Sequence, residues 1–195
     1  MGPPSAGIVP PRRRNLRNLN GASAFIKTAI ETNRMKSEFL QQYDHTWKVL
    51  ERIVDNFDDP AWAGAGRKRY CPARLAFHIL HATKYYLEDK TETPFASGKS
   101  FEIDWTKAKA GELPSREDVR AAVKVWKEKT AAWISEMDID SDNESFPWAG
   151  ETKGGVALFL LRHTLFHLGE LSSLLNESRN GEVEDHYVAA QQSES

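Results

Sequence analysis

Apolar residues recur every three or four positions in four separate stretches of the chain, and this spacing is typical of helices that bury one face. In the first stretch, from Ser37 to Phe57, the repeating positions are Phe39, Leu40, Tyr43, Trp47, Leu50, Val54 and Phe57. The preceding residues 24–32 predict either a shorter helix or an extension of this one. Asp58-Asp59-Pro60 then interrupts the pattern, so we expect the helix to end near Phe57.

A second helix is predicted from Pro72 to about Glu88, because the fixed φ of proline suits the first helical turn. Residues that share one face of this helix are Leu75, His78, Ile79, Ala82 and Tyr86. His81 lies about 60° away from that apolar stripe. His78 is therefore the histidine of this helix that we expect to point into the interior.

Residues 89–114 have no sustained period and contain Pro94, Gly98, Gly111 and Pro114. A connection of this length inside a compact domain is usually either functional or a crossover. It is long enough to return the chain to the end at which the second helix began, so the second and third helices are expected to run parallel.

The third helix is predicted to start after Ser115, which has Asp118 three residues on as in a capping box, and to run to about Met137. The fourth helix, about Val156 to Ser178, is apolar nearly all round, and we expect it to be the most buried element. Four helices without a convincing strand predict an all-α four-helix bundle with a long crossover between helices two and three.

The length of 195 residues suits one domain with one core. We expect a flexible basic tail over residues 1–22, the bundle over residues 23–180 and a flexible, polar tail over residues 181–195. The first thirty residues contain no acid, as in a mitochondrial presequence. Prolines at positions 3, 4, 10 and 11 argue against the amphipathic helix of a presequence and favour the tail.

Charge and cysteine usage narrow the classes of partner. Lys plus Arg (26) nearly balance Asp plus Glu (28), and the net charge of -2 gives no field that would attract nucleic acid. No apolar run is long enough to span a membrane. Cys71 is the only cysteine, so no intrachain disulfide forms and a reducing, cytoplasmic location is expected. Its place before Pro72 suits either a packed thiol or one activated by the helix dipole.

Three histidines are the candidate metal ligands. His163 and His167 are four residues apart and so project from one face of the fourth helix, with Glu170 continuing that face. His78 brings a third imidazole from another apolar face, and His81 is its rival. Three histidines leave a coordination position open, as in catalytic zinc sites, whereas packed or hydrogen-bonded histidines are the alternative.

Two motifs carry a resemblance to a known family: PARLAFHILH at positions 72–81 and LRHTLFHLGEL at positions 161–171. Together they resemble the DinB/YfiT-like superfamily over roughly positions 36–178. The resemblance implies an up-down-down-up four-helix bundle that holds nickel, zinc or a similar divalent ion through His78, His163 and His167. Characterised members of that superfamily include transferases and isomerases that use mycothiol or bacillithiol.

The function expected from these observations is that of a metal-dependent enzyme, a hydrolase or a thiol-dependent transferase, acting on a small molecule. The ion would polarise a bound water or thiol, with Glu170 as the candidate catalytic residue, a general base or a partner of an imidazole N–H. The alternatives are a noncatalytic bundle that serves as a dimerisation or interaction module, with or without a stabilising metal. A homodimer is the expected assembly, and Trp62, Trp105 and Trp148 either line a pocket or dimer contact or anchor loops.

Overall fold

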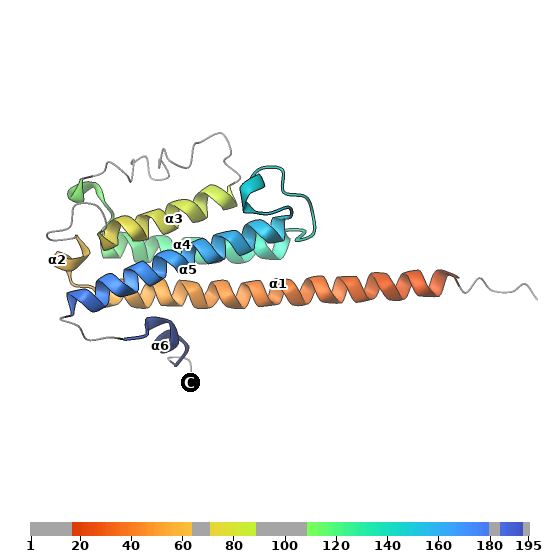
Figure 1. Cartoon of the computed structure of the whole chain (residues 1–195), viewed down its shortest axis with the longest axis horizontal. Helices are drawn as coiled ribbons and strands as arrows, with labels where there is room; N and C mark the ends of the chain where they lie inside the picture. The colour runs from red at the N-terminus through yellow and green to blue at the C-terminus, as the bar shows by residue number, and fades with distance from the viewer. Residues whose placement is uncertain (1–16, 64–70, 89–108, 180–183, 193–195) are drawn as a thin grey trace, which may run out of the picture. The chain divides into compact units, whose positions relative to one another are not determined.

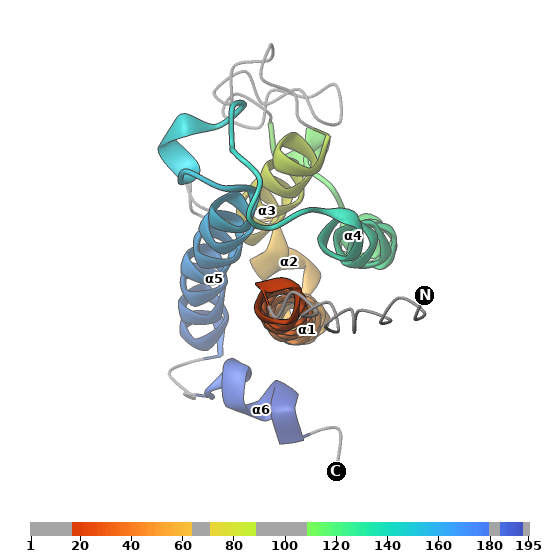
Figure 2. The same ribbon diagram turned by 90° about the vertical axis from the view of Figure 1, so that its right-hand side faces the viewer.

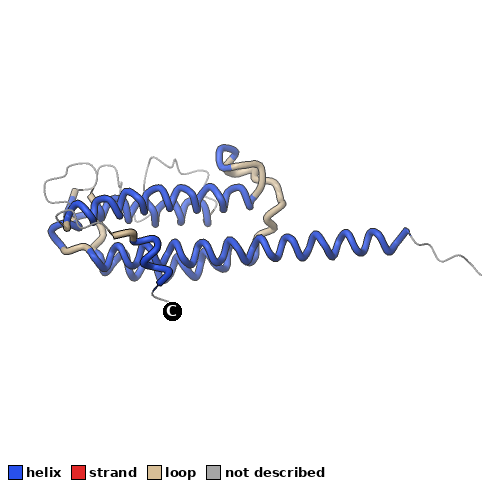
Figure 3. Tube along the Cα trace, turned by 60° about the horizontal axis from the view of Figure 1, so that its bottom comes forward, coloured by secondary structure: helices blue, strands red, loops and turns tan. Residues whose placement is uncertain are grey.

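The computed structural model describes residues 17–63, 71–88, 109–179 and 184–192, and this part of the chain is helical. Figure 3 draws it as helices joined by loops, without a strand. The only β-type pairing among these residues is an isolated bridge between Asp142 and Thr152. The all-α prediction is therefore confirmed for the described residues, whereas most of the predicted crossover, residues 89–108, lies outside them.

The elements are named here in chain order, as in Figure 1. The α-helices are α1 (Arg17–Asn56), α2 (Asp59–Trp62), α3 (Pro72–Leu87), α4 (Arg116–Glu136), α5 (Lys153–Ser178) and α6 (His186–Gln192). Two short 3-10 helices, η3 (Ala110–Glu112) and η4 (Pro147–Ala149), lie in the connections before α4 and α5. The four helices predicted from the apolar pattern correspond to α1, α3, α4 and α5.

The chain divides into two units between Met35 and Lys36, and α1 belongs to both. In the first unit the described residues are helical, and Lys27 and Glu31 form an ion pair one turn apart. Residues 24–32 thus extend the first helix, which is one of the two predicted outcomes. Residues 17–22 of the predicted tail are helical. Residues 1–16 of that tail lie outside the described residues.

Helix boundaries in the second unit follow local chemistry. Pro72 occupies the first turn of α3, where its missing N–H costs nothing. At the start of α4, Ser115 Oγ accepts a hydrogen bond from the Asp118 amide at 3.1 Å, and the Asp118 carboxylate accepts one from the Ser115 amide at 2.9 Å. This reciprocal capping box confirms the predicted N-terminus of α4.

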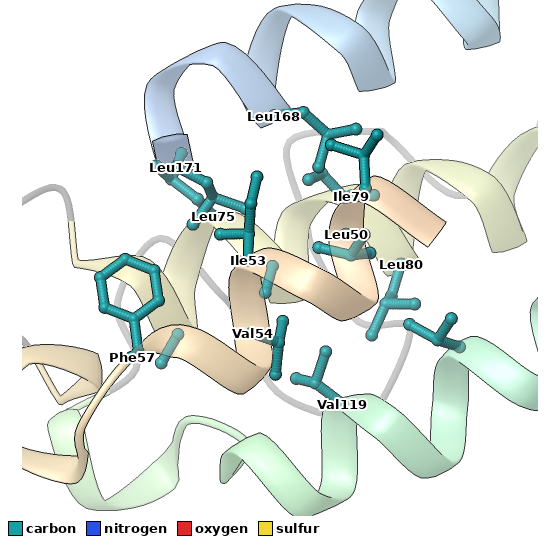
Figure 4. Packing of buried hydrophobic residues seen from close by; sticks show 14 of the residues in the cluster. Leu50, Ile53, Val54, Phe57, Leu75, Ile79, Leu80, Val119, Leu168 and Leu171 are labelled. Carbon is teal, nitrogen blue, oxygen red and sulfur yellow. The ribbon is translucent and has the colours of Figure 1, made fainter. Parts of the chain in front are cut away.

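Beside a second cluster with residues of the same four helices, one hydrophobic cluster joins α3, α4, α5 and the part of α1 after Lys36. Figure 4 shows Leu50 and Ile53 of α1, Ile79 of α3, Val119 of α4 and Leu168 of α5 in this cluster. In Figure 2 α3 lies between α4 and α5, and it contacts both. The core therefore positions α3 and α5 side by side, which matters for the histidines that they carry.

Helix α3, and not α5, is the most buried element, so the expectation for α5 was wrong. Nearly every residue of α3 is buried, including His81, which lies off the predicted stripe. On α5, Leu158 is 54% exposed and Phe166 is 65% exposed. The reason is position: α3 is covered by α4 and α5, whereas α5 has one face without a neighbour among the described residues.

The loop between α4 and α5 is fixed by hydrogen bonds and by two glycines. Asn143 Nδ2 donates to the carbonyls of Phe146 and Gly150, both at 2.6 Å. Gly150 has a φ of 131°, which L side chains rarely adopt. A Cβ at Gly154 would lie 2.9 Å from the Ile139 carbonyl oxygen, so the loop passes close to the first turn of α5 because glycine is there.

The predicted flexible tail after Gly181 is corrected for residues 186–192, which form α6. His186 and Ala190 are buried, and Glu184 forms ion pairs with Arg52 of α1 and Arg179 at the end of α5. The polar composition of this segment suggested a loose tail. Its few charged groups instead have specific partners on two helices, and these contacts hold the segment against α1 and α5.

Candidate metal centre

The three predicted histidines come together where α3 and α5 pack against each other. The spacing of four residues places His163 and His167 on one face of α5, and the α3–α5 contact brings His78 to them. Ring centroids are 5.0 Å apart for His78 and His163 and 4.6 Å apart for the two pairs that include His167. Residues 85 positions apart in sequence therefore form one cluster.

The rings approach one another through their Nε2 atoms. His163 Nε2 lies 3.2 Å from His78 Nε2 and 3.2 Å from His167 Nε2. One ligand atom from each of the three residues lies within 4.8 Å of the others. The three histidines are thus close enough together to bind a single metal ion.

The separations fit a common ion. Nitrogens about 2.1 Å from one ion are about 3.0–3.4 Å apart when the angle between them lies between a right angle and the tetrahedral value. The two separations that involve His163 Nε2, 3.2 Å each, fall within that range. Hydrogen bonding explains the arrangement less well, because a neutral imidazole nitrogen carries one hydrogen or one lone pair and His163 Nε2 can then pair with only one of its two neighbours.

Burial keeps two of the rings neutral. Burial, together with the nearby imidazoles of His167, His163 and His81, lowers the pKa of His78 to about 3. Burial and then His167 lower the pKa of His163 to about 4. At pH 7 both rings are therefore unprotonated, which is the form of histidine that binds metal ions.

Glu170 contacts the outer side of the cluster. In the tautomer in which His167 Nδ1 carries the proton, this N–H donates to Glu170 Oε2 at 2.7 Å. That hydrogen bond leaves the lone pair of His167 on Nε2, facing the other two rings. Glu170 is thus placed to orient a ligand, and its contact with Nδ1 puts it outside the group of three Nε2 atoms.

Aromatic side chains flank the two histidines of α5. The Phe159 ring is stacked on His163 with centroids 6.3 Å apart and 14° between the planes, and Phe166 meets His167 edge-on at 5.2 Å. The guanidinium of Arg162 lies 5.8 Å from the Phe159 ring centroid. Sequence analysis missed Phe159, although its place four residues before His163 puts it on the same helical face.

His81, the rival for the first ligand, lies elsewhere. Its ring is buried and stacked on Phe77, with centroids 6.4 Å apart and 10° between the planes. No atom of His81 belongs to the group of three close ligand atoms. The apolar stripe of α3 therefore predicted correctly that His78, and not His81, joins the α5 pair.

The other sequence candidates have structural roles where they are described. Cys71 is buried at the N-terminus of α3. Trp62 is buried and donates from Nε1 to the Pro114 carbonyl at 3.0 Å, and Trp148 donates from Nε1 to Tyr86 Oη at 3.0 Å. These bonds agree with anchoring of loops. Trp105 lies outside the described residues.

The fold and this cluster together define an all-α protein with three histidines close enough to hold one metal ion. Comparisons of the chain with models of known protein families, with curated proteins and with solved structures found no match. Within the described part of the chain, no helix has an apolar stretch long enough to cross a bilayer. The geometry of the histidine cluster is therefore the feature from which a function can be inferred.

Proposed function

We propose that this chain is a metal-dependent enzyme of the DinB/YfiT-like superfamily, a hydrolase or thiol-dependent transferase that acts on a small molecule. The observation that carries the proposal is that His163 Nε2 lies 3.2 Å from both His78 Nε2 and His167 Nε2, and that one ligand atom from each of the three residues lies within 4.8 Å of the others. Nickel and zinc are the ions that we expect, because imidazole nitrogen suits both.

The proposal includes an up-down-down-up four-helix bundle in which the segment between α3 and α4 is the crossover. A core shared by α1, α3, α4 and α5 supports this topology. The two sequence motifs that carry the family resemblance lie on α3 and α5. One histidine on the second long helix and two on the fourth is the distribution that the resemblance implies.

Each side chain has a distinct role in this proposal. The three imidazoles hold the ion, which supplies Lewis acidity toward a water or thiol when bound. Glu170 orients His167 through the Nδ1 hydrogen bond and so acts as a positioning residue. Phe159, stacked on His163, restricts rotation of that ring.

An open coordination position supports catalysis over a purely structural metal. Structural zinc sites have four protein ligands, whereas catalytic sites have three. Among the described residues the group of close ligand atoms contains three histidines and no fourth side chain. The Glu170 carboxylate, the nearest candidate for a fourth ligand, is bonded to His167 Nδ1.

Elemental analysis of protein purified without a histidine tag tests whether metal is bound. We expect about one equivalent of nickel or zinc per chain, and loss of that metal in the His163→Ala variant. Less than about a tenth of an equivalent, even after supplementation with both ions, would contradict the proposal.

A noncatalytic, metal-stabilised module is the second candidate, and it is favoured by the position of the site between two helices, with His78 only 5% exposed. Cobalt substitution separates the two functions. If the site is catalytic, added 2-mercaptoethanol or azide changes the visible absorption of the cobalt protein, because an open position accepts the ligand. An unchanged spectrum, together with a melting temperature raised by the metal, would favour the noncatalytic module.

A further inference from the structure

A cavity lies where the C-terminal ends of α3 and α4 meet the first turns of α5. Its volume is about 280 Å³, close to the lower limit of small-molecule sites, and it is partly open to solvent. Its walls come from the last turns of α3 and α4, the loop over residues 142–146 and the first turns of α5. Tyr86 in its wall is eight residues beyond His78, or roughly 12 Å along α3, so the cavity is separate from the histidine cluster.

Aromatic rings form much of the wall. Tyr86, Trp133 and Phe146 all line the cavity, and the Tyr86 and Phe146 rings meet with centroids 4.8 Å apart. Tyr86 and Phe146 are buried and Trp133 is half-buried. The electron-rich faces of such rings attract cations, with tryptophan the strongest of them.

The charges at the rim are mainly negative. Glu136, Asp142 and Glu144 line the cavity and are exposed, whereas Lys153 is the only cationic side chain among the described residues of its wall. None of these three carboxylates forms an ion pair with another described residue. A concave site with carboxylates at its rim concentrates positive ions because the protein walls have a low dielectric constant.

Helix ends add to the same field. The C-termini of α3 and α4 both reach the cavity, through Leu87 and Glu136, and each carries a partial negative charge. The N-terminus of α5, at Lys153, opposes them with a partial positive charge. Around the cavity, the negative groups described are two helix C-termini and three carboxylates, and the positive groups are one helix N-terminus and one lysine. The balance of charge is therefore negative.

The wall is held in place before any ligand binds. The Asn143 amide N–H donates to the Glu151 carbonyl at 2.8 Å, and Asn143 Oδ1 accepts a hydrogen bond from the Phe146 amide at 2.9 Å. The side-chain bonds of Asn143 to the Phe146 and Gly150 carbonyls hold the same loop. Because the wall is already ordered, binding of a small ligand costs less conformational entropy of the protein.

We propose that this cavity binds a small organic cation of the alkylammonium class, with the ammonium group against the aromatic wall and the carboxylates around it. The proposal does not depend on a metal at the histidine cluster, because no histidine of that cluster lines the cavity.

Titration with choline and with its uncharged isostere 3,3-dimethyl-1-butanol tests the proposal, since the two differ in charge but hardly in shape. Binding is followed by the indole N–H resonances in ¹H–¹⁵N spectra. We expect choline to bind in the low millimolar range, at least about fivefold more tightly than the alcohol, and more weakly as salt rises. Equal affinities for the two probes, or no choline binding below about 50 mM, would overturn the proposal.

Two variants locate the binding site. Glu136→Gln, at an exposed position, is expected to weaken choline binding about threefold, and Glu128→Gln, an exposed position elsewhere on α4, is the matched control with unchanged affinity. Trp133→Leu is expected to weaken binding at least about fivefold. If wild type and Glu136→Gln bind choline equally well, the cation binds elsewhere and the assignment is wrong. Loss of choline binding when the protein is freed of metal would also contradict the assignment.

Discussion

Two of the regions that contain a buried imidazole differ in their surroundings. At the α3–α5 contact, His78, His163 and His167 face one another through their Nε2 atoms. At the first residue of α6, the neighbours of His186 are of other kinds: its Nε2 lies 3.3 Å from Asn176 Oδ1 and its Nδ1 lies 3.5 Å from Glu184 Oε2.

The difference distinguishes a site from a structural contact. His186 has an amide and a carboxylate as partners, and Arg52 and Arg179 balance the charge of that carboxylate. The polar groups around this ring are of mixed kind and charge, and they do not form a set of like donor atoms. Three neutral imidazoles whose nitrogen lone pairs point toward one another repel each other, and a metal cation is the ligand that complements them. Burial of a histidine alone therefore does not indicate a metal site, whereas the three imidazoles at the α3–α5 contact are close enough together to bind one ion.

Removal of one ring from each region gives the largest expected contrast. We expect His78→Ala to weaken zinc or nickel binding by more than about 100-fold, because it removes one of three ligands. His186→Ala should leave the affinity unchanged within about twofold, since His186 contacts α5 away from the cluster. Competition with a chromophoric chelator measures both affinities. Equal losses in the two variants would remove the contrast between the regions.

Acid should also affect the regions differently. The unfolded chain takes up a proton on His78 near pH 6.5, but burial lowers the folded pKa to about 3, so stability falls as pH decreases below 6.5. Between pH 7 and pH 5 this group accounts for about 2 kcal/mol in the metal-free protein.

Urea unfolding of the metal-free protein at pH 7 and pH 5 measures that loss of stability. The His78→Leu variant should lose about half of the pH dependence, because burial also lowers the pKa of His163, to about 4, and His163 contributes a similar amount. The His186→Ala variant should lose less of it, because burial lowers the pKa of His186 but Glu184 opposes that shift. Carboxylates with ordinary pKa values titrate mainly below this window. An identical pH dependence in wild type and His78→Leu would contradict the prediction.

The carboxylates that accompany the two histidine regions should have separable effects. Glu170→Ala is expected to weaken metal binding about tenfold, because His167 loses the acceptor that fixes its tautomer. Glu170→Gln keeps an acceptor oxygen and should recover part of the affinity. Calorimetric titration with zinc measures both variants. If Glu170→Ala binds zinc as tightly as wild type, Glu170 has no positioning role.

The smallest effect is expected at Glu184, which pairs with Arg52 and Arg179 at the surface. Glu184→Gln should lower the free energy of unfolding by at most about 1 kcal/mol, because both ion pairs are partly exposed. Hydrogen exchange should become faster in residues 186–192 while metal affinity stays constant. Protection of α6 equal to that in wild type would show that these ion pairs do not hold the helix.

Local chemistry explains the parts of the fold that were predictable. Helix α4 begins at the capping box of Ser115 and Asp118, and helix α3 begins at Pro72. His163 and His167 share a face of α5 because they are four residues apart. Each of these features involves residues within one or two turns of each other. The amino-acid pattern was therefore enough to predict them.

The burial of individual side chains and the residues that they contact were harder to predict, because both depend on which element covers each helical face. The apolar composition of α5 suggested a fully buried helix, yet Phe166 is exposed because no described element lies over it. The polar composition after Gly181 suggested a tail, yet α6 forms, with Glu184 between Arg52 and Arg179. Periodicity reports which residues share a face, and it does not report which neighbour the face meets.

The chain's own sequence determined that helices form, where most of them begin, and that His78 lies in an apolar stripe. Only the tertiary structure decided that the ring of His78 meets His163 across 85 positions of sequence, and that a cavity with aromatic walls and an acidic rim forms where α3, α4 and α5 meet. The physical reason is that capping and helical periodicity act over a few residues, whereas convergence of donor atoms depends on the packing of separate helices.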